Sequence, residues 1–435
     1  MVIKRKGIKQ MNKYKLTESQ LGIFLYNKFF KAPAQINPCG SVVIDEILDF
    51  IKLKRAINIY VEKNEATRIH ICNTLLGPRQ YIEDFKPINI RVIDIEDESA
   101  VRKIENRYSN FKFNLTKDRL FKVELVRFKD GKGGIVCCFN HIISDGFSME
   151  LALRDIINIY RNGEDDYNPG SYIKHLELEQ KYFSSNRYKK DKAFWEEETE
   201  KLKNPKAGII PYDKNGEKNK SATITYKLDK KNVKKIQKYC KENKISEYSF
   251  FTSVFNLYVG KVSQSDEFTI QMVTSNRKNH EEKNTFGPFF DGAYFFAKIK
   301  DIEIGQYIKE TSNHLFRASL HYKYPVSKVT KLLKKKGIKS FIAAKIYFSY
   351  QVMRNTDLYY KKKCKINWAP MKGTYIYDIL INLHDIGNTG NIYMVINYMA
   401  NRYKKETIDK LSMGIAKIID QILKDDKKNI GSIEI

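Results

Sequence analysis

The chain has 435 residues, of which 42% are apolar and 13% aromatic, so it can bury a substantial core and is not a disordered chain. Lys and Arg number 78 against 51 Asp and Glu, a formal net charge of +27. No apolar run reaches the length of about 18 residues that marks a membrane-spanning helix, and no signal peptide follows the basic N-terminus. The charge fits compositional drift, but it also favours anionic partners: nucleic acid, anionic lipid, a phosphate-bearing cofactor or an acidic protein.

The six cysteines offer no metal site. They occupy positions 39, 72, 137, 138, 240 and 364, and none forms a CxxC pair or lies at zinc-ligand spacing from a histidine. Cys137 and Cys138 are adjacent in an apolar run, so their side chains should point to opposite faces of a strand. We interpret the cysteines as buried free thiols in a reducing cytosol.

The first half of the chain alternates helical and extended patterns. Helical spacing of apolar residues predicts helices over 16–30, 42–62, 99–108 and 148–160. Ser99 is a candidate cap of the third helix and Ser148 of the fourth. Apolar runs bounded by turn residues predict strands over 68–76, 88–95, 120–128 and 134–139. The last two strands form a hairpin through Lys129-Asp130-Gly131, so the glycines at 131–134 belong to a turn and not to a nucleotide-binding loop.

The second half repeats this alternation after a break. Residues 161–170 predict a loop, 172–203 a polar helical stretch, and 204–220, with two prolines and two glycines, the clearest linker. Beyond it we predict strands over 222–228, 268–274, 292–300, 375–384 and 392–399, a turn at 387–390, and helices over 231–242, 247–261, 304–322 and 405–423. The chain therefore has two α/β halves of similar size. Their antiparallel hairpins predict mixed sheets and not a parallel doubly wound sheet.

The segment around His141 is the best candidate for chemistry. A predicted strand delivers His141 into a short loop before a helix, where a cleft could form. Asp145 can bend back to hold the loop, Gly146 permits a close backbone approach or a positive φ, and Ser148 can cap the helix or donate to an anion. Two interpretations stay open from the residues alone: a capped loop with a packed histidine, or a general base with a pKa of about 6.5. No nucleophilic Ser or Cys stands out elsewhere, which favours direct transfer over a covalent intermediate.

The sequence His141-Ile142-Ile143-Ser144-Asp145-Gly146 resembles the HHxxxDG motif of nonribosomal peptide synthetase condensation domains, part of the CoA-dependent acyltransferase superfamily. Five further segments resemble motifs of that family in the same order. They are Leu16 to Phe24 with Thr17 and Gln20, Asn64 to Arg68, Tyr172 with Ala193-Phe194-Trp195, Asn276-Arg277 with Thr285 to Phe290, and His321 to Val326. The resemblance covers residues 12 to 433.

The resemblance implies a fold and a domain arrangement. Condensation domains have two chloramphenicol-acetyltransferase-like lobes that form a V-shaped pseudo-dimer with a central tunnel. The predicted linker lies near the boundary expected between the lobes. We therefore expect an N-terminal lobe over 1–203, which carries the His141 motif, and a C-terminal lobe over 204–435.

The resemblance also implies roles at the active site. His141 would orient or deprotonate the attacking amine, Gly146 would lend its backbone N–H to the developing oxyanion or the tunnel wall, and Ser148 would assist there. Asp145 and Arg277 would form a structural ion pair that fixes the loop. No metal is implied.

Two departures from the family pattern concern structure and specificity. Asn140 stands where the family has the first histidine of its pair, a mainly structural position. Phe147, Phe289 and Asp291 are the candidates for lining the tunnel, and Asp291 stands where the family's usual asparagine would fall. These departures affect substrate choice more than the chemistry.

The function implied is acyl transfer in natural-product biosynthesis. An acyl or aminoacyl thioester on the phosphopantetheine arm of a carrier protein would meet an amine, or a hydroxyl, and an amide or ester would form. No cofactor would be bound. Two alternatives stay open: an acyltransferase of the same fold that uses acyl-CoA, and a non-catalytic docking domain.

The expected partners are acidic carrier proteins, which the charge of +27 would attract, and a small-molecule acceptor. We expect a free-standing, monomeric, cytoplasmic protein with neither nucleic acid nor a membrane as partner. The lysine runs at 331–339 and 361–363 are interpreted as solvated surfaces, because no nucleic-acid-binding motif accompanies them.

Overall fold

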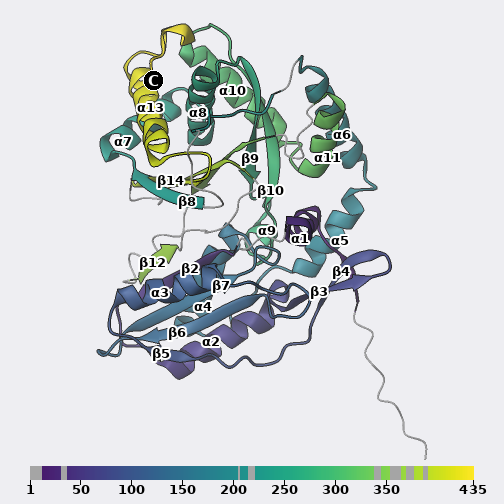
Figure 1. The fold of residues 1–435 in the computed structure, drawn as a ribbon. Coiled ribbons are helices and arrows are strands. Elements are labelled where there is room, and N and C mark those ends of the chain that lie inside the picture. The colour runs from purple at the N-terminus through teal and green to yellow at the C-terminus, as the bar shows by residue number, and fades with distance from the viewer. Residues whose placement is uncertain are drawn as a thin grey trace, which may run out of the picture. The chain divides into compact units, whose positions relative to one another are not determined.

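The computed structural model describes residues 12–30, 37–203, 206–213, 221–337, 344–352, 364–368, 377–385 and 390–435, and this chain groups into two compact units (Figure 1). The first unit takes the described residues up to Lys181, the segment Arg277–Phe289 and the strand at 364–368. The second takes Tyr182–Asn276 and the other described residues from Phe290 onward. The lobe boundary expected between residues 203 and 204 stays a prediction.

A five-stranded sheet forms the centre of the first unit. Its order is β12 (Cys364–Trp368), β2 (Cys39–Ile44), β7 (Gly133–Phe139), β6 (Phe121–Arg127) and β5 (Val92–Asp94). The middle strand β7 is buried along its whole length and pairs antiparallel with β2 and β6. Gly133 and Gly134, which were predicted to belong to the turn, lie in this strand. Gly134 is required there, because a Cβ atom would lie 2.0 Å from the Val42 carbonyl oxygen. Strand β12 comes from late in the chain and closes the β2 edge in antiparallel register.

Helices α2 (Phe50–Lys63), α3 (Glu98–Ser109) and α4 (Gly146–Asn162) pack around this sheet. The Cys138 thiol faces α3, where it donates to the Tyr108 carbonyl over 3.3 Å. A smaller antiparallel sheet has the order β1 (Tyr14–Lys15), β4 (Gly77–Ile82), β3 (Ile69–Thr74). The unit also holds α1 (Glu18–Phe30), the 3₁₀ turn η1 (Glu65–Arg68), α9 (His280–Lys283) and most of α5 (Tyr172–Tyr182).

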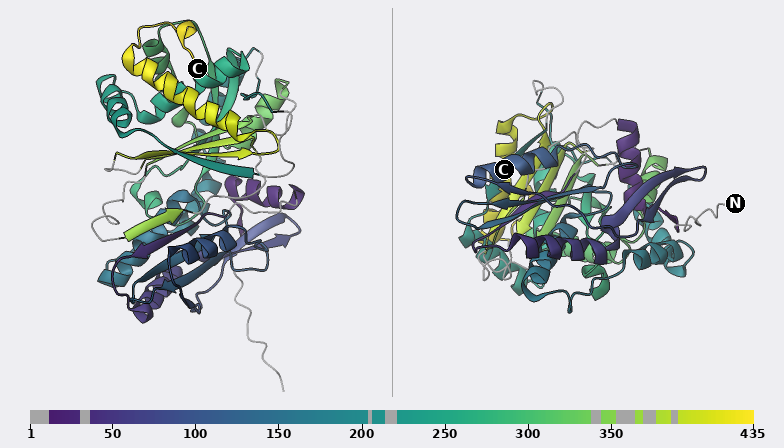
Figure 2. Two further views of the ribbon diagram at one scale, coloured as in Figure 1. Left: turned by 60° about the vertical axis from the view of Figure 1, so that its left-hand side comes forward. Right: turned by 90° about the horizontal axis from the view of Figure 1, so that it is seen from below.

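The second unit contains a six-stranded mixed sheet (Figure 2). Its order is β10 (Asp291–Lys298), β9 (Glu267–Thr274), β11 (Ile346–Val352), β13 (Ile379–Asp385), β14 (Ile392–Met399) and β8 (Ser221–Lys227). Strand β11 runs parallel to β9 and β13, whereas the other pairs are antiparallel. The helices are α6 (Asn186–Glu200), α7 (Lys230–Glu242), α8 (Glu247–Ser263), α10 (Ile304–Ser319), α11 (Val326–Lys335) and α13 (Lys405–Lys424), and the short turn η3 (Ile430–Ser432) follows. The predicted mixed α/β class is confirmed.

One predicted helix is wrong. Residues 42–62 were expected to form a single helix, but β2 runs to Ile44 and α2 begins only at Phe50. The β-branched run Val42-Val43-Ile44 favours an extended backbone and pairs with two strands. Asp49 then caps α2, since its carboxylate accepts from the backbone N–H groups of the second and third helical residues.

The predicted caps Ser99 and Ser148 are also wrong, because Asp97 caps α3 and Asp145 caps α4. The helical stretch at 172–203 is two helices, separated where Ser185 caps α6. The sequence patterns missed β4, α9, α11, β11 and β12, and β5 is shorter than predicted. Of the linker at 204–220 only residues 206–213 are described, and residues 387–389 of the predicted turn lie outside the described residues.

Candidate active site

His141 lies in a tight loop between β7 and α4. Its Nδ1 atom is 2.7 Å from the Ser144 carbonyl oxygen. Because a carbonyl only accepts, Nδ1 carries the proton in this bond and the lone pair of the neutral ring lies on Nε2. The side chain is half-buried. The loop therefore fixes the tautomer that can take a proton through Nε2.

Asn140 is fully integrated into the turn that carries His141. Its side-chain oxygen accepts from the Ile142 backbone N–H at 3.0 Å, and its amide donates to the Asn37 side chain at 3.0 Å. Its backbone carbonyl accepts from the Ile143 N–H and from the Ser144 hydroxyl. An asparagine thus supplies local hydrogen bonds that hold this turn.

The Thr17 and Gln20 segment contacts the same loop. The Gln20 amide donates to the Ile142 carbonyl at 3.0 Å and exchanges hydrogen bonds with the Gln80 side chain at 2.9 and 2.7 Å. Gln20 is held in turn by reciprocal bonds with Thr17 at the start of α1. Both glutamines have no solvent exposure. This first motif of the chain therefore supports the His141 loop from a distant part of the sequence.

The ion pair that the resemblance implied between Asp145 and Arg277 is present. One guanidinium nitrogen of Arg277 lies 3.1 Å from each oxygen of the Asp145 carboxylate, and both side chains are almost completely buried, with 1% exposure for Arg277 and 4% for Asp145. The carboxylate also accepts from the backbone N–H groups of Ser148 and Phe289. Asp145 thus caps α4 and fastens the loop after His141 at the same time.

The Arg277 guanidinium organises the rest of this network. Its nitrogens donate to the backbone carbonyls of Glu282, Thr285 and Gly287 and to the Ser148 hydroxyl. The rings of Phe147 and Phe289 lie 4.7 and 4.1 Å from the guanidinium carbon, a cation–π arrangement. The buried charge is therefore compensated by a carboxylate, neutral acceptors and aromatic faces together.

Ser148 has little freedom to act on a substrate. Its hydroxyl donates to the Gly287 carbonyl at 2.7 Å and accepts from the Gly287 N–H at 3.1 Å and from Arg277 at 2.8 Å. These three contacts use the single proton and both lone pairs. Gly287 itself admits no side chain, since a Cβ atom would lie 2.5 Å from the Tyr172 ring.

Burial lowers the pKa of the His141 imidazole below its ordinary value of 6.5, while Asp145 and the Ser144 carbonyl act in the opposite direction. A histidine with a lowered pKa is neutral at pH 7 and can accept a proton there. Together with the fixed tautomer, this gives the loop the properties of a general base.

The predicted site residues do not all fall in one unit. The structure brings eight of the nine together in the first unit, and Asp291 belongs to the second. The eight are Asn140, His141, Asp145, Gly146, Phe147, Ser148, Arg277 and Phe289.

Gly146 begins α4 as a helical residue, and Phe147 is 37% exposed whereas Phe289 is 3% exposed. Asp291 accepts from the Gly292 and Val326 backbone N–H groups.

Asn37 and Gln80 support the loop, and the sequence analysis missed both. Each makes its contact through a side chain buried far from His141 in sequence. Neither lies in a motif-like segment, so no signal in a single sequence marks them. They become visible only through the hydrogen bonds of the folded chain.

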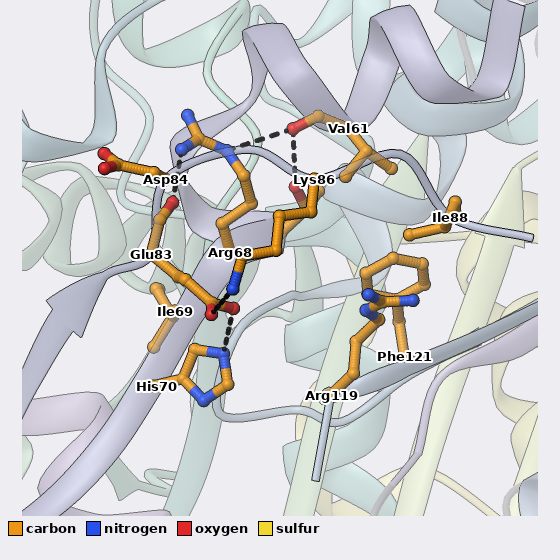
Figure 3. A pocket seen from close by; sticks show the side chains of 11 residues that line it. Val61, Arg68, Ile69, His70, Glu83, Asp84, Lys86, Ile88, Arg119 and Phe121 are labelled. Carbon is orange, nitrogen blue, oxygen red and sulfur yellow. Dashed lines mark hydrogen bonds and ion pairs between the residues drawn. The ribbon is translucent and has the colours of Figure 1, made fainter. Parts of the chain in front are cut away.

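The segment ending at Arg68 borders a pocket in the first unit (Figure 3). Arg68 donates to the Val61, Glu62 and Glu83 carbonyls, so it ties η1 to α2 and to the end of β4. The Glu83 carboxylate bonds His70 and Lys86 at the pocket rim. The Glu83 carboxylate and its partners His70 and Lys86 are thus engaged within the protein, and we assign no ligand to this pocket.

Among the described residues, no group of three or more His, Cys, Asp or Glu side chains could hold a metal ion. Within the same part of the chain, no helix has both the length and the apolar character needed to cross a membrane. The cysteines there are free, and Cys72 alone of the six is not buried.

A family model for the condensation domain matches residues 10–435. The chain therefore belongs to the condensation-domain family, whose members form amide bonds between carrier-bound substrates in natural-product synthetases. It is 25% identical to surfactin synthase subunit 1 of Bacillus subtilis (strain 168), over 94% of this chain and 12% of that protein. It is 20% identical to bacitracin synthase 1 of Bacillus licheniformis, over 88% of this chain and 7% of that protein. The chain thus spans a small part of the length of these curated relatives.

Solved structures show the same fold. The condensation domain of the monacolin K polyketide synthase MokA superposes with a TM-score of 0.83 at 13% identity, over 97% of this chain and 99% of that one. The X-domain from teicoplanin biosynthesis superposes with a TM-score of 0.81 at 15% sequence identity, over 99% of both chains. A mutant starter condensation domain of rhizomide synthetase RzmA, in complex with C8-CoA, superposes with a TM-score of 0.81 at 14% sequence identity. The superposition covers 97% of this chain and 98% of that one.

Proposed function

We propose that this protein transfers an acyl or aminoacyl group from the phosphopantetheine thioester of an acidic carrier protein to an amine acceptor, with a hydroxyl as the less favoured acceptor. The observation that carries the proposal is the state of His141: a neutral imidazole whose Nδ1 proton is held by the Ser144 carbonyl. A base in this state suits the deprotonation of an amine near neutral pH. Membership of the condensation-domain family supports the same reaction class.

The proposed step needs no covalent enzyme intermediate. The acceptor nitrogen forms a bond to the thioester carbonyl carbon while Nε2 of His141 takes its proton. The resulting tetrahedral oxyanion collapses, the carbon–sulfur bond breaks, and the leaving thiolate receives the proton from His141. The backbone N–H of Gly146, at the N-terminus of α4, is the proposed donor to the oxyanion.

The other residues at this site have positioning roles in the proposal. Asp145, Arg277 and Asn140 hold the loop through the contacts given above. Ser148, for which the resemblance implied a catalytic role, fits a positioning role better because its hydroxyl is already engaged. Phe147 and Phe289 flank Arg277, and their role as substrate-lining residues stays a prediction, as does that of Asp291.

The donor can be identified by a direct comparison. We expect an acyl group on a phosphopantetheinylated carrier protein to react with a kcat/KM at least about tenfold higher than the same acyl group on CoA, because the positively charged protein attracts an acidic carrier. Raising the salt concentration should reduce this advantage, since exposed charges are screened. Equal kcat/KM values for the two donors would remove the carrier from the proposal and leave an acyl-CoA-dependent enzyme of the same fold.

The pH dependence should report His141. Because the pKa of the imidazole lies below 6.5, the protonated and inactive form accumulates only in acid. We expect kcat/KM to be level near pH 7 and to fall on the acid side with an apparent pKa below 6.5. Melting curves over the same pH range separate this effect from acid unfolding. An acid limb centred above 6.5 in a folded enzyme would contradict the assignment.

A docking role without catalysis is the second candidate, because Asn140 replaces the first histidine of the family motif. The fold does not separate the two candidates, since it is shared by condensation domains and by an X-domain whose complex with OxyB has been solved. Carrier binding measured for the wild type and for His141→Ala decides between them. Equal binding with no turnover by either protein would identify a scaffold. Turnover by the wild type alone supports the enzyme, and we further propose that it acts as a cytoplasmic monomer.

A further inference from the structure

The tip of the β3–β4 hairpin exposes two adjacent leucines. Leu75 and Leu76 have relative exposures of 106% and 82%, so neither packs against the described chain. Figures 1 and 2 show this hairpin extending away from the sheets of its own unit. Turn positions usually carry Gly, Asn, Asp, Ser or Pro. Two fully exposed leucines at such a position are therefore not explained by the turn itself.

The turn presents these leucines in a fixed geometry. Thr74 and Gly77 pair across the hairpin, and Gly77 adopts the positive φ of 94° that this turn requires. The Thr74 hydroxyl donates to the Gly77 carbonyl at 2.8 Å and accepts from the Leu76 backbone N–H at 3.2 Å. Little conformational freedom is left to be lost when the tip is covered.

Basic side chains that form no ion pair with a described carboxylate lie behind the tip. The sequence contains no Asp or Glu over residues 12–17 or 69–82, which form most of this small sheet. Lys13 and Lys15 are exposed, and Lys15 pairs with Arg79 across strands β1 and β4. None of these three side chains forms an ion pair with a described carboxylate. The strands themselves therefore carry cations and no carboxylate, and the nearest acidic residue in the sequence of the hairpin, Glu83, follows the end of β4 and is engaged with His70 and Lys86.

The spacing between the leucines and the cations matches a lipid surface. Arg79 follows Leu76 by three residues, which places it roughly 10 Å behind the tip at about 3.4 Å per residue. Apolar groups of peripheral proteins enter the boundary between headgroups and acyl chains by about 5–10 Å. With the leucines at that depth, the basic side chains would lie among the headgroups. A convex tip also fits a planar surface, whereas a protein partner would need a matching cavity.

We propose that this hairpin docks the protein peripherally on an anionic membrane surface, with Leu75 and Leu76 inserted at the interface and Lys13, Lys15 and Arg79 contacting lipid phosphates. The net charge of +27 would add long-range attraction to the same surface. The proposal concerns docking on one leaflet and requires no spanning segment, and it replaces the expectation from the sequence that a membrane is not a partner. It is independent of the proposed acyl transfer, since it uses none of the residues around His141.

Co-sedimentation of the full chain with vesicles tests the proposal. We expect binding to vesicles of phosphatidylglycerol mixed with phosphatidylcholine and at least about tenfold weaker binding to pure phosphatidylcholine. The double variant Leu75→Ser/Leu76→Ser should lose at least about tenfold in affinity for the anionic vesicles. Met413→Ser, which removes another exposed apolar side chain on α13, is the matched control and should bind as the wild type does.

A second pair of variants tests the role of the cations. Lys15→Gln/Arg79→Gln should weaken binding more than Lys230→Gln/Lys231→Gln, which removes the same charge from the exposed start of α7. An equal loss of vesicle affinity in these two double variants would mean that binding depends on diffuse electrostatic attraction, and it would overturn the proposal. The proposal is also overturned if the wild type does not sediment with anionic vesicles, or if the leucine variant binds them as well as the wild type does. The exposed tip would then be a candidate site for a protein partner. Acyl transfer in solution should be the same in the leucine variant and the wild type.

Discussion

His141→Ala should abolish amide formation from a carrier-bound donor while the protein stays folded. A positioned general base contributes roughly 10²–10⁴-fold to a rate, so the remaining turnover should fall by at least that factor. The half-buried imidazole bonds to a carbonyl in its own loop, and its removal leaves the Asp145–Arg277 network in place. Product formation in a single-turnover assay with a charged carrier measures the loss.

The matched control is His280→Ala, which removes an exposed histidine on α9 whose ring contacts the Asn284 side chain. That variant should turn over at the wild-type rate. Unchanged turnover by His141→Ala would remove the proposed base, and equal loss in both variants would point to a general effect on the fold. Near-wild-type melting of His141→Ala confirms that the comparison concerns chemistry.

Arg277→Ala should be among the most destabilising single substitutions in the first unit. It leaves the Asp145 carboxylate buried without a cation and removes the donors that hold Gly287 and Ser148. Breaking a buried pair by deleting one partner costs about 3–5 kcal/mol. We expect the midpoint of thermal unfolding to fall by several degrees, whereas the ranking of alternative substrates should change little.

A double-variant cycle sharpens this prediction. Asp145→Ala/Arg277→Ala should destabilise less than the sum of the two single variants, because each single variant already leaves the other charge uncompensated. Arg127→Ala is the control, since Arg127 pairs with Asp94 on the exposed surface of the same unit. Its loss should change the melting temperature little, because exposed ion pairs contribute little to stability. A melting temperature of Arg277→Ala equal to that of the wild type would contradict the role of the ion pair.

Local patterns predicted elements whose signals lie within the element itself. The alternation and turn residues of 120–139 predicted the β6–β7 hairpin, and the Asp49-capped helix was recognised in part by its periodicity. The error over 42–62 arose because a β-branched strand and a following helix are both apolar, and their periodicities merge in a short window. Strand β12 was missed because its pairing with β2 depends on residues more than 300 positions away.

The residues around His141 were predicted partly from local patterns and partly from the resemblance to a family. Strand, loop and helix signals placed His141 in a cleft-like position, but its role and the pairing of Asp145 with Arg277 came from the resemblance to a family. The contacts of Gln20, Asn37 and Gln80 with this region could not be predicted, because buried amides pair according to tertiary structure. For the same reason the engagement of the Ser148 hydroxyl was not foreseen.

The position of β12 in the first unit has a consequence for biosynthesis. This strand is formed by Cys364–Trp368, whereas the other strands of its sheet are complete by Phe139. A ribosome must therefore translate most of the remaining chain before the β2 edge can be covered, and Arg277, 132 residues after Asp145, becomes available earlier than this strand. Until then β2 presents unpaired backbone groups to other nascent chains, so chaperones would have this edge to protect during synthesis.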